Sequence, residues 1–193
     1  MICFKPLRRL DKVARCFILS LFLFVPNAHA EGFNIVNANA LFNQSSLAVD
    51  AQLDLSLSDA VEEALHNGIS ITLLMTLDLY KSRKYRWDER IARWPFRHHI
   101  NYHSLSDRYV LTNHIEGESH SYASLVDLFN EIESFSFRSE ILGETLPSSK
   151  HGYKLHLKIA IDKAALPAPL RVSSYIFPAW RVKSETHEWF IDN

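Results

Sequence analysis

Cysteine is almost absent from this chain of 193 residues, and both copies, Cys3 and Cys16, lie within the first 30 positions. A chain that begins at residue 31 has no thiol. Disulfide bonds, cysteine nucleophiles and thiolate metal sites are then excluded. Because no covalent cross-link is available, a hydrophobic core must supply the stability of the fold.

Glycine and long apolar runs are scarce as well. With five glycines in the chain, the glycine-rich loops that bind phosphates cannot be placed. The longest apolar run covers ten residues, from Cys16 to Val25, whereas a membrane-spanning helix needs roughly 20. The sequence therefore predicts no transmembrane span.

The first 30 residues have the composition of an export signal. Basic residues precede the apolar run, and Ala28-His29-Ala30 places small residues at the spacing of a cleavage site. We expect a signal peptide over residues 1–30, cleaved near Ala30, and a single exported globular domain over residues 31–193 in the bacterial periplasm. The basic residues are Lys5, Arg8, Arg9, Lys12 and Arg15.

The charge balance shifts once this segment is removed. It holds five of the 21 Lys and Arg and one of the 22 Asp and Glu, so residues 31–193 carry a net charge of −5. Mild acidity together with export argues against nucleic acid as a ligand.

Alternation of apolar and polar residues, the pattern of half-buried strands, dominates the rest of the sequence. It runs through residues 47–57, 69–79 and 153–161. The prolines of residues 166–170 indicate an extended connection to a C-terminal edge strand, and residues 142–152 indicate a long loop. Trp180, Trp189 and Phe190 are expected to pack on the sheet, with ligand stacking as the alternative.

Two segments depart from the alternation and predict short helices. Ser58 or Asp59 can cap the first, which Asn67-Gly68 would end. Ser121 can cap the second, which carries apolar residues at three- and four-residue spacing up to Ile132. We expect an α+β fold, mostly antiparallel β, with sandwich-like sheets and two short packed helices.

Residues 69–115 fit a three-stranded meander. A tight turn at Asp88-Glu89 would pair Leu77 with Ile100, and a turn over residues 104–107 would pair Tyr102 with Tyr109. Both registers keep apolar residues on one face, and a one-residue slip in either would reverse them.

Residues 81–97 form the most unusual stretch, with seven Lys and Arg interleaved with aromatic residues. The predicted register places Arg83 opposite Trp94 and Lys84 opposite Arg93. Arginine with tryptophan suits an acidic protein partner in the envelope or an anionic membrane surface. A solvated edge hairpin whose charges prevent association is the alternative. The predicted binding surface consists of Arg83, Arg86, Trp87, Arg90, Arg93, Trp94 and Arg97.

Histidines and acidic residues offer a weaker alternative. Zinc needs three or four converging ligands, and the predicted register spreads the histidines over different faces and strand ends, so we expect no metal and no cofactor. An envelope hydrolase would need a pocket that joins His98 or His103 with an acid such as Asp107. Gly117-Glu118-Ser119-His120-Ser121 lacks the closing glycine of a nucleophile elbow.

The order of several motifs resembles a known family of exported proteobacterial proteins, domain of unknown function four-three-nine-zero. The resemblance covers roughly residues 53–191. It implies a periplasmic location and an accessory role beside membrane sensor kinases, and it supplies no catalytic residues. Its motifs are Asn67-Gly68-Ile69, Arg86-Trp87-Asp88, residues 100–106, residues 109–111 and residues 166–170.

The sequence as a whole predicts a non-catalytic periplasmic binding module with its contact surface on residues 81–97. The hydrolase, the sensor-kinase accessory protein and a small outer-membrane barrel, which alternating strands after a signal peptide can also indicate, are the alternatives.

Overall fold

The computed structural model describes residues 32–43, 46–113, 117–140 and 152–191. The chain divides into two compact units, Met1–Ala30 and Glu31–Asn193, and all of the described residues belong to the second. Among them, no helix has both the length and the hydropathy needed to cross a membrane. The predicted loop over residues 142–152 lies outside the described residues except for Gly152.

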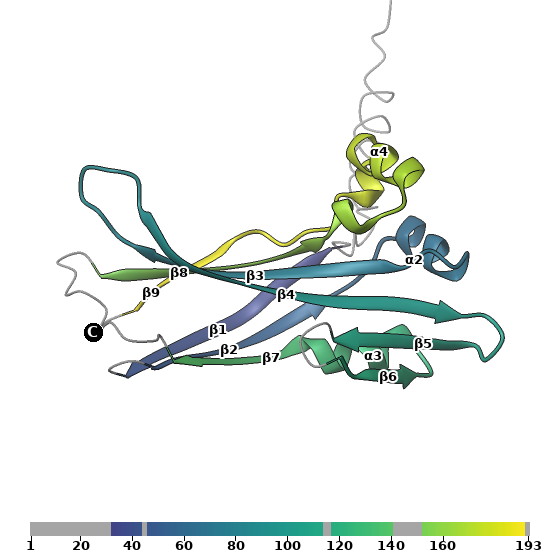
Figure 1. Ribbon diagram of the computed structural model, residues 1–193, viewed down its shortest axis with the longest axis horizontal. Helices are drawn as coiled ribbons and strands as arrows, with labels where there is room; N and C mark the ends of the chain where they lie inside the picture. Colours follow the sequence, from purple (N-terminus) through teal and green to yellow (C-terminus); the bar gives the residue numbers. More distant parts are fainter. Residues whose placement is uncertain (1–31, 44–45, 114–116, 141–151, 192–193) are drawn as a thin grey trace, which may run out of the picture. The chain divides into compact units, whose positions relative to one another are not determined.

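The second unit contains two antiparallel sheets, which Figure 1 shows as two layers. The strands of the six-stranded sheet, in order across it, are β6 (Ser119–Tyr122), β5 (Arg108–Asn113), β4 (Glu89–His103), β3 (Ile71–Lys81), β8 (Tyr153–Ile161) and β9 (His187–Ile191). The three-stranded sheet has the order β1 (Phe33–Asn43), β2 (Ser46–Leu55) and β7 (Ser134–Glu140).

Aromatic side chains join the two sheets. Trp94 of β4 packs on Phe137 of β7, with ring centroids 5.3 Å apart, and Phe96 of β4 contacts both Phe135 and Phe137 at 5.0 and 5.2 Å. β1 contacts β9 at the other side of the sandwich. The inner face of each sheet therefore buries its apolar residues against the other sheet.

Three α-helices and two 3₁₀ turns complete the described part of the chain. The helices are α2 (Asp59–His66), α3 (Leu125–Glu133) and α4 (Ala168–Ile176), and the 3₁₀ turns are η1 (Lys163–Ala165) and η2 (Pro178–Trp180). α3 contacts β2, β5, β6 and β7, so it covers the part of the six-stranded sheet that the smaller sheet leaves open. α2 buries Val61 and Leu65 and contacts β4.

These observations confirm the α+β, mostly antiparallel prediction and correct three details. Ser124, not Ser121, caps α3, because Ser121 lies in β6 and the Ser124 hydroxyl accepts the backbone N–H of Asp127 at 3.1 Å. Ser58 is the N-cap residue of α2, but its hydroxyl donates to the Ala179 carbonyl instead of capping the helix.

The third correction concerns the prolines. They open α4 instead of an extended strand, since Pro169 lies in the first turn, where a missing N–H costs nothing. The C-terminal edge strand does form, as β9. Trp180 is buried and Trp189 packs against the core, whereas Phe190 is exposed.

Alternation predicted the central strands well. In β2 every second side chain from Leu47 to Leu55 is buried, and in β8 every second one from Tyr153 to Ile161. β1 escaped prediction because a bulge between Ile35 and Asn37 shifts the inward positions by one residue, which breaks its period of two.

The turn over residues 104–107 has the predicted register, with Tyr102 opposite Tyr109 and Ile100 opposite Leu111. The register predicted for β3 and β4 is wrong by six residues: Leu77 lies opposite Trp94, and Ile100 opposite Ile71. Because six is even, the paired side chains from Ile71 to Leu79 and from Ala92 to Ile100 keep their predicted faces, whereas a bulge after Leu79 moves Arg90 to the other face.

The buried carboxylate of Asp78 explains the shift. The predicted register would have placed Asp78 opposite His99, whereas the observed one places it opposite Arg93, which is always charged. A buried carboxylate is costly without a cationic partner, so the observed register is the more stable of the two.

Leu77 tests the inner face of β3. It is 0% exposed, so Leu77→Asp would place an unpaired charge in the core and should cost more than about 4 kcal/mol of stability. Urea denaturation measures the loss. Leu105→Asp, at the fully exposed tip of the β4–β5 turn, is the control and should unfold like the wild type; equal curves for both variants would contradict the described core.

Candidate functional site

The loop between β3 and β4, residues 82–88, is called the hairpin tip below. Asp88 holds it in place: its Oδ1 accepts the backbone N–H of Arg83 at 3.1 Å, and its Oδ2 lies 3.3 Å from Lys154 Nζ on β8. The hydrogen bond from Arg83 and then the charge of Lys154 keep the pKa of Asp88 below its usual value. The carboxylate therefore fastens the tip to the sheet.

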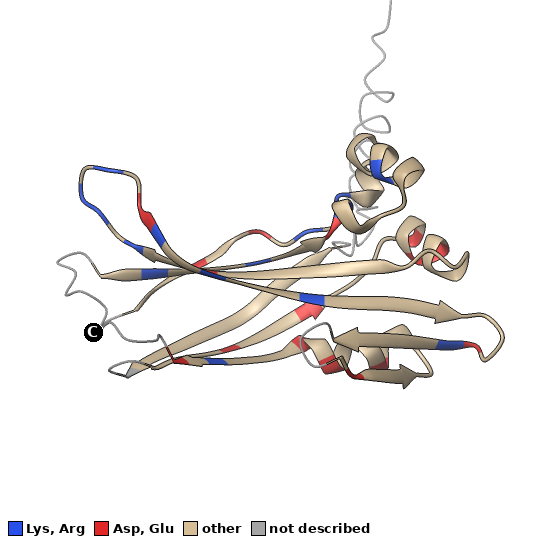
Figure 2. Ribbon diagram, in the orientation of Figure 1, with Lys and Arg blue, Asp and Glu red and all other residues tan. Residues whose placement is uncertain are grey.

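The rest of the tip faces solvent. Trp87 is 96% exposed and Tyr85 is 88% exposed. With Arg83, Lys84 and Arg86 they line an open recess of about 620 Å³. In Figure 2 this loop is the most continuous stretch of Lys and Arg, and in Figure 1 it curves away from the plane of the sheet. The tip thus combines cationic and aromatic side chains that, for the most part, do not pack within the fold.

Arg83 is the partial exception. Its guanidinium forms an ion pair with Glu89 at the start of β4. The predicted contact of Arg83 with Trp94 is wrong, as is that of Lys84 with Arg93, because the tip begins beyond the last residue pair of the two strands.

The other predicted residues belong to β4 and divide between its faces. Trp94 lies between the two sheets, against Phe137. Arg93 and Arg97 lie on the opposite, outer face and form ion pairs with Asp78 and Asp162. Arg90 is exposed opposite Tyr80. The structure therefore brings together Arg83, Arg86 and Trp87 in the tip, while Arg93, Trp94 and Arg97 have structural contacts of their own.

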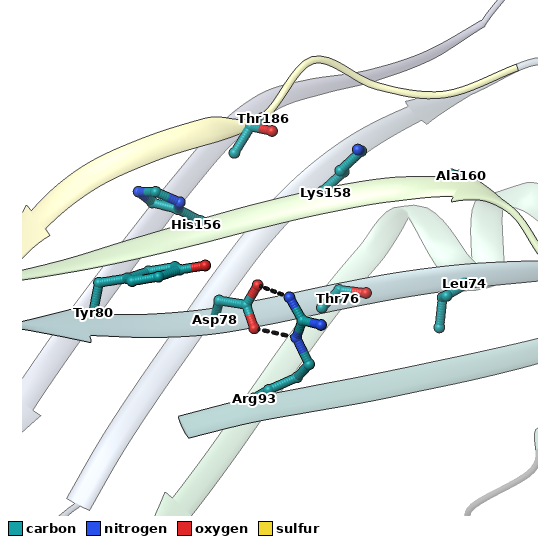
Figure 3. A pocket seen from close by; sticks show the side chains of 9 residues that line it. All are labelled: Leu74, Thr76, Asp78, Tyr80, Arg93, His156, Lys158, Ala160 and Thr186. Carbon is teal, nitrogen blue, oxygen red and sulfur yellow. Dashed lines mark hydrogen bonds and ion pairs between the residues drawn. The ribbon is translucent and has the colours of Figure 1, made fainter. Parts of the chain in front are cut away.

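A pocket of about 340 Å³ lies on the outer face of the six-stranded sheet (Figure 3). Cross-strand neighbours form one polar row, in which Arg93 of β4, Asp78 of β3, His156 of β8 and Glu188 of β9 lie side by side. Sequence reasoning missed this row, because it depends on pairing between strands far apart in the chain. The sequence did contain a signal for this row: Asp78 and His156 are polar residues at even-numbered positions of two mostly apolar strands, β3 and β8.

Asp78 and Arg93 form the strongest contact in the row. Arg93 donates Nε to Asp78 Oδ1 at 2.6 Å and Nη2 to Asp78 Oδ2 at 2.7 Å, so the pair is bidentate. The Asp78 carboxylate raises the pKa of Arg93 above its usual value. Both carboxylate oxygens of Asp78 are therefore occupied.

The second half of the row is centred on His156. Its ring packs on Tyr80, with centroids 4.6 Å apart, and its Nε2 lies 3.5 Å from Glu188 Oε2. Lys154 Nζ lies 2.8 Å from Glu188 Oε1. The lysine lowers the pKa of Glu188, and Glu188 in turn raises the pKa of Lys154.

A hydrolytic triad would need a carboxylate that orients a histidine beside a nucleophile. The Asp78 carboxylate accepts two hydrogen bonds from Arg93, and His156 Nε2 lies 3.5 Å from Glu188 Oε2. Elsewhere in the described chain, the Thr72 hydroxyl lies 2.8 Å from His99 Nδ1, but Thr72 is buried, out of reach of a substrate. The predicted pairing of His98 or His103 with Asp107 does not occur: these histidines lie opposite Asn113 and Arg108, and Asp107 accepts the hydroxyl of Tyr102.

The described residues contain no cluster of three or more His, Cys, Asp or Glu that could hold a metal ion. His114 and His151, two of the histidines in the sequence, lie outside the described residues.

The family model described as "Domain of unknown function (DUF4390)" matches residues 30–190. No curated protein and no solved structure matches the chain. The family description assigns no activity, so the geometry of the tip and the pocket is the basis for a functional argument.

Replacement of Arg93 tests the ion pair. Arg93→Ser would leave the buried carboxylate of Asp78 without its partner and should cost about 1–3 kcal/mol. Arg86→Ser, in the exposed tip, should change stability by less than about 0.5 kcal/mol. Thermal or urea unfolding distinguishes the two, and a double-mutant cycle with Asp78→Ser measures the coupling. Additive losses in that cycle would show that the pair contributes nothing.

His98 makes stability depend on pH. Burial, and to a smaller extent the nearby His99, lowers its pKa from 6.5, and its Nδ1 is buried without a hydrogen-bond partner. The unfolded chain therefore binds a proton more readily, and the free energy of unfolding should fall as the pH drops below 6.5 through the folded-state pKa.

Urea denaturation between neutral and mildly acidic pH measures this dependence. It should weaken in His98→Gln, which cannot titrate, and should persist in His103→Gln on the exposed end of the same strand. An unchanged pH dependence in His98→Gln would assign the effect to other groups.

Proposed function

The chain belongs to the DUF4390 family, and we propose that it is a non-catalytic binding module of the bacterial cell envelope whose contact surface is the hairpin tip. One observation carries the proposal: Trp87 and Tyr85 are almost fully exposed within a loop that also exposes Arg83, Lys84 and Arg86. Tryptophan, tyrosine and arginine are the residues that contribute most to protein interfaces.

The contacts that hold the backbone of the tip in place support a role in binding. Asp88, at one end of the loop, accepts the backbone N–H of Arg83 near the other end and contacts Lys154 of β8, so the exposed side chains extend from a backbone fixed to the sheet. A fixed loop loses less conformational entropy on binding than a free one. The recess among the five side chains gives a partner residue a place to enter.

The charge of the tip favours an acidic protein over a bilayer. Its three exposed cations would attract carboxylates and accelerate association. Asp88 and Glu89 stand directly beside them, and both would be repelled by a uniformly negative lipid surface, whereas a protein partner can place its charges individually. An accessory role beside a sensor kinase would be one instance of this function, with an acidic periplasmic segment of the kinase as the partner.

Export is part of the proposal. It rests on the basic and apolar composition of residues 1–30 and on the cleavage spacing at Ala28-His29-Ala30.

In-cell photo-crosslinking tests the proposal. A photoreactive amino acid in place of Trp87 should capture an acidic envelope protein, and the crosslinked chain should fractionate with the periplasm. Replacement of Arg83, Lys84 and Arg86 by Gln should abolish the capture and leave the melting curve unchanged, because exposed charges contribute little to stability.

The same photoreactive group at Leu105, equally exposed at the tip of the β4–β5 turn, is the matched control and should not capture that protein. Capture from both positions, or capture that survives the triple replacement, would refute the tip as the contact surface.

A further inference from the structure

In α4 several apolar side chains are exposed and a polar side chain is buried. The one residue of this helix that is buried is a serine, Ser174, which is 0% exposed and donates its hydroxyl to the Arg171 carbonyl. Val172, Tyr175 and Ile176 are 62–65% exposed, and Phe177, which directly follows the helix, is 56% exposed. Their spacing of three and four residues places Val172, Tyr175 and Ile176 on one side of the helix. A helix that packs onto a core shows the opposite arrangement.

Cations surround this apolar surface. Lys163 Nζ donates to the Ser174 carbonyl at 2.6 Å and lies 5.0 Å from the centre of the Tyr175 ring. Arg181 Nη2 donates to the Tyr175 carbonyl at 3.5 Å. Arg181 and Lys183 lie close enough to Lys163 to contribute to lowering its pKa, after the larger effect of burial. The cations therefore gather at the C-terminal end of α4.

The same stretch has no acidic residue. Residues 163–183 contain four cations, Lys163, Arg171, Arg181 and Lys183, and neither Asp nor Glu. Figure 2 shows Lys and Arg in this part of the fold. Acidic residues flank the stretch on both sides: Asp162, which forms an ion pair with Arg97, directly precedes Lys163, and Glu185 follows Lys183 by two residues. An apolar helix face with Lys and Arg along its border is the composition of helices that lie in a membrane interface.

We propose that α4 and the residues around it, 163–183, form a docking surface for an anionic lipid bilayer. Val172, Tyr175, Ile176 and Phe177 enter the boundary between headgroups and acyl chains, and the four cations contact the lipid phosphates. Each Lys or Arg near such a surface strengthens binding by a factor of about five.

Charge argues against the other occupants. A second copy would bring the same cationic surface against this one in a two-fold interface. Residues 1–30 carry five Lys and Arg and one acidic residue, so this segment would also be repelled. A bilayer with anionic headgroups is complementary to both the charge and the apolar residues.

This inference is independent of the proposed function. The hairpin tip follows Lys81 of β3, whereas α4 and η1 follow Ile161 of β8, which lies opposite Leu73 near the other end of β3. Loss of one surface therefore leaves the other intact.

Vesicle sedimentation tests the proposal, with protein recovered from cells that express the full chain. The protein should sediment with vesicles of equimolar phosphatidylcholine and phosphatidylglycerol and should remain in solution with phosphatidylcholine alone. Added salt should weaken binding, since it screens exposed charges. Replacement of Arg171, Arg181 and Lys183 by Gln should weaken binding about a hundredfold, at a factor of about five for each charge.

Matched variants separate the outcomes. Val172→Ser should weaken binding, whereas Val126→Ser, on α3 and 69% exposed, should not. The triple Gln replacement in the hairpin tip should bind vesicles like the wild type.

Three results would overturn the proposal. The first is an absence of sedimentation with the anionic vesicles. The second is equal binding by the Val172 and Val126 variants. The third is a decrease in oligomeric mass, by light scattering, in Val172→Ser without any effect on vesicles, which would assign the surface to a second copy.

Discussion

The described fold depends on the two different faces of β3. Its odd-numbered side chains from Leu73 to Leu79 are buried between the sheets, and its even-numbered ones face the outer pocket. β3 lies between β4 and β8, so its register sets the position of these two neighbouring strands. One residue on the outer face, Asp78, restricts that register because its buried carboxylate needs a cation, which Arg93 provides.

The hairpin tip is a consequence of that register. With Asp78 opposite Arg93, Lys81 and Glu89 form the last residue pair of β3 and β4. The seven residues 82–88 between them remain outside the ladder. A bulge leaves Ile91 without a partner and redirects the end of the hairpin. The cations and aromatic residues of the tip thus extend into solvent, where a tight turn at Asp88-Glu89 would have placed several of them within the sheet.

The described part of the chain offers two cationic surfaces with different character. The tip mixes three exposed cations with two aromatic residues and two adjacent acids, and its arginines can pair individually with carboxylates. The surface around α4 has aliphatic and aromatic residues bordered by four cations, and the acid beside them in the sequence, Asp162, pairs with Arg97. The first combination favours a partner whose charges match the geometry of the tip. The second favours a surface whose average electrostatic potential is negative. One domain that carried both could hold a protein partner close to a membrane.

The sequence by itself determined the class of the fold, because period-two alternation in β2, β3 and β8 reports directly which side chains face the core. It also located the cationic, aromatic stretch, since composition needs no structure. It failed for β1, where a bulge breaks the period, and for α4, whose apolar residues point outward instead of inward. Only the tertiary structure decided the register of β3 and β4, the polar row from Arg93 to Glu188 and the exposure of α4. Each of these depends on residues far apart in the chain, and local patterns carry no information about which distant charge will satisfy a buried one.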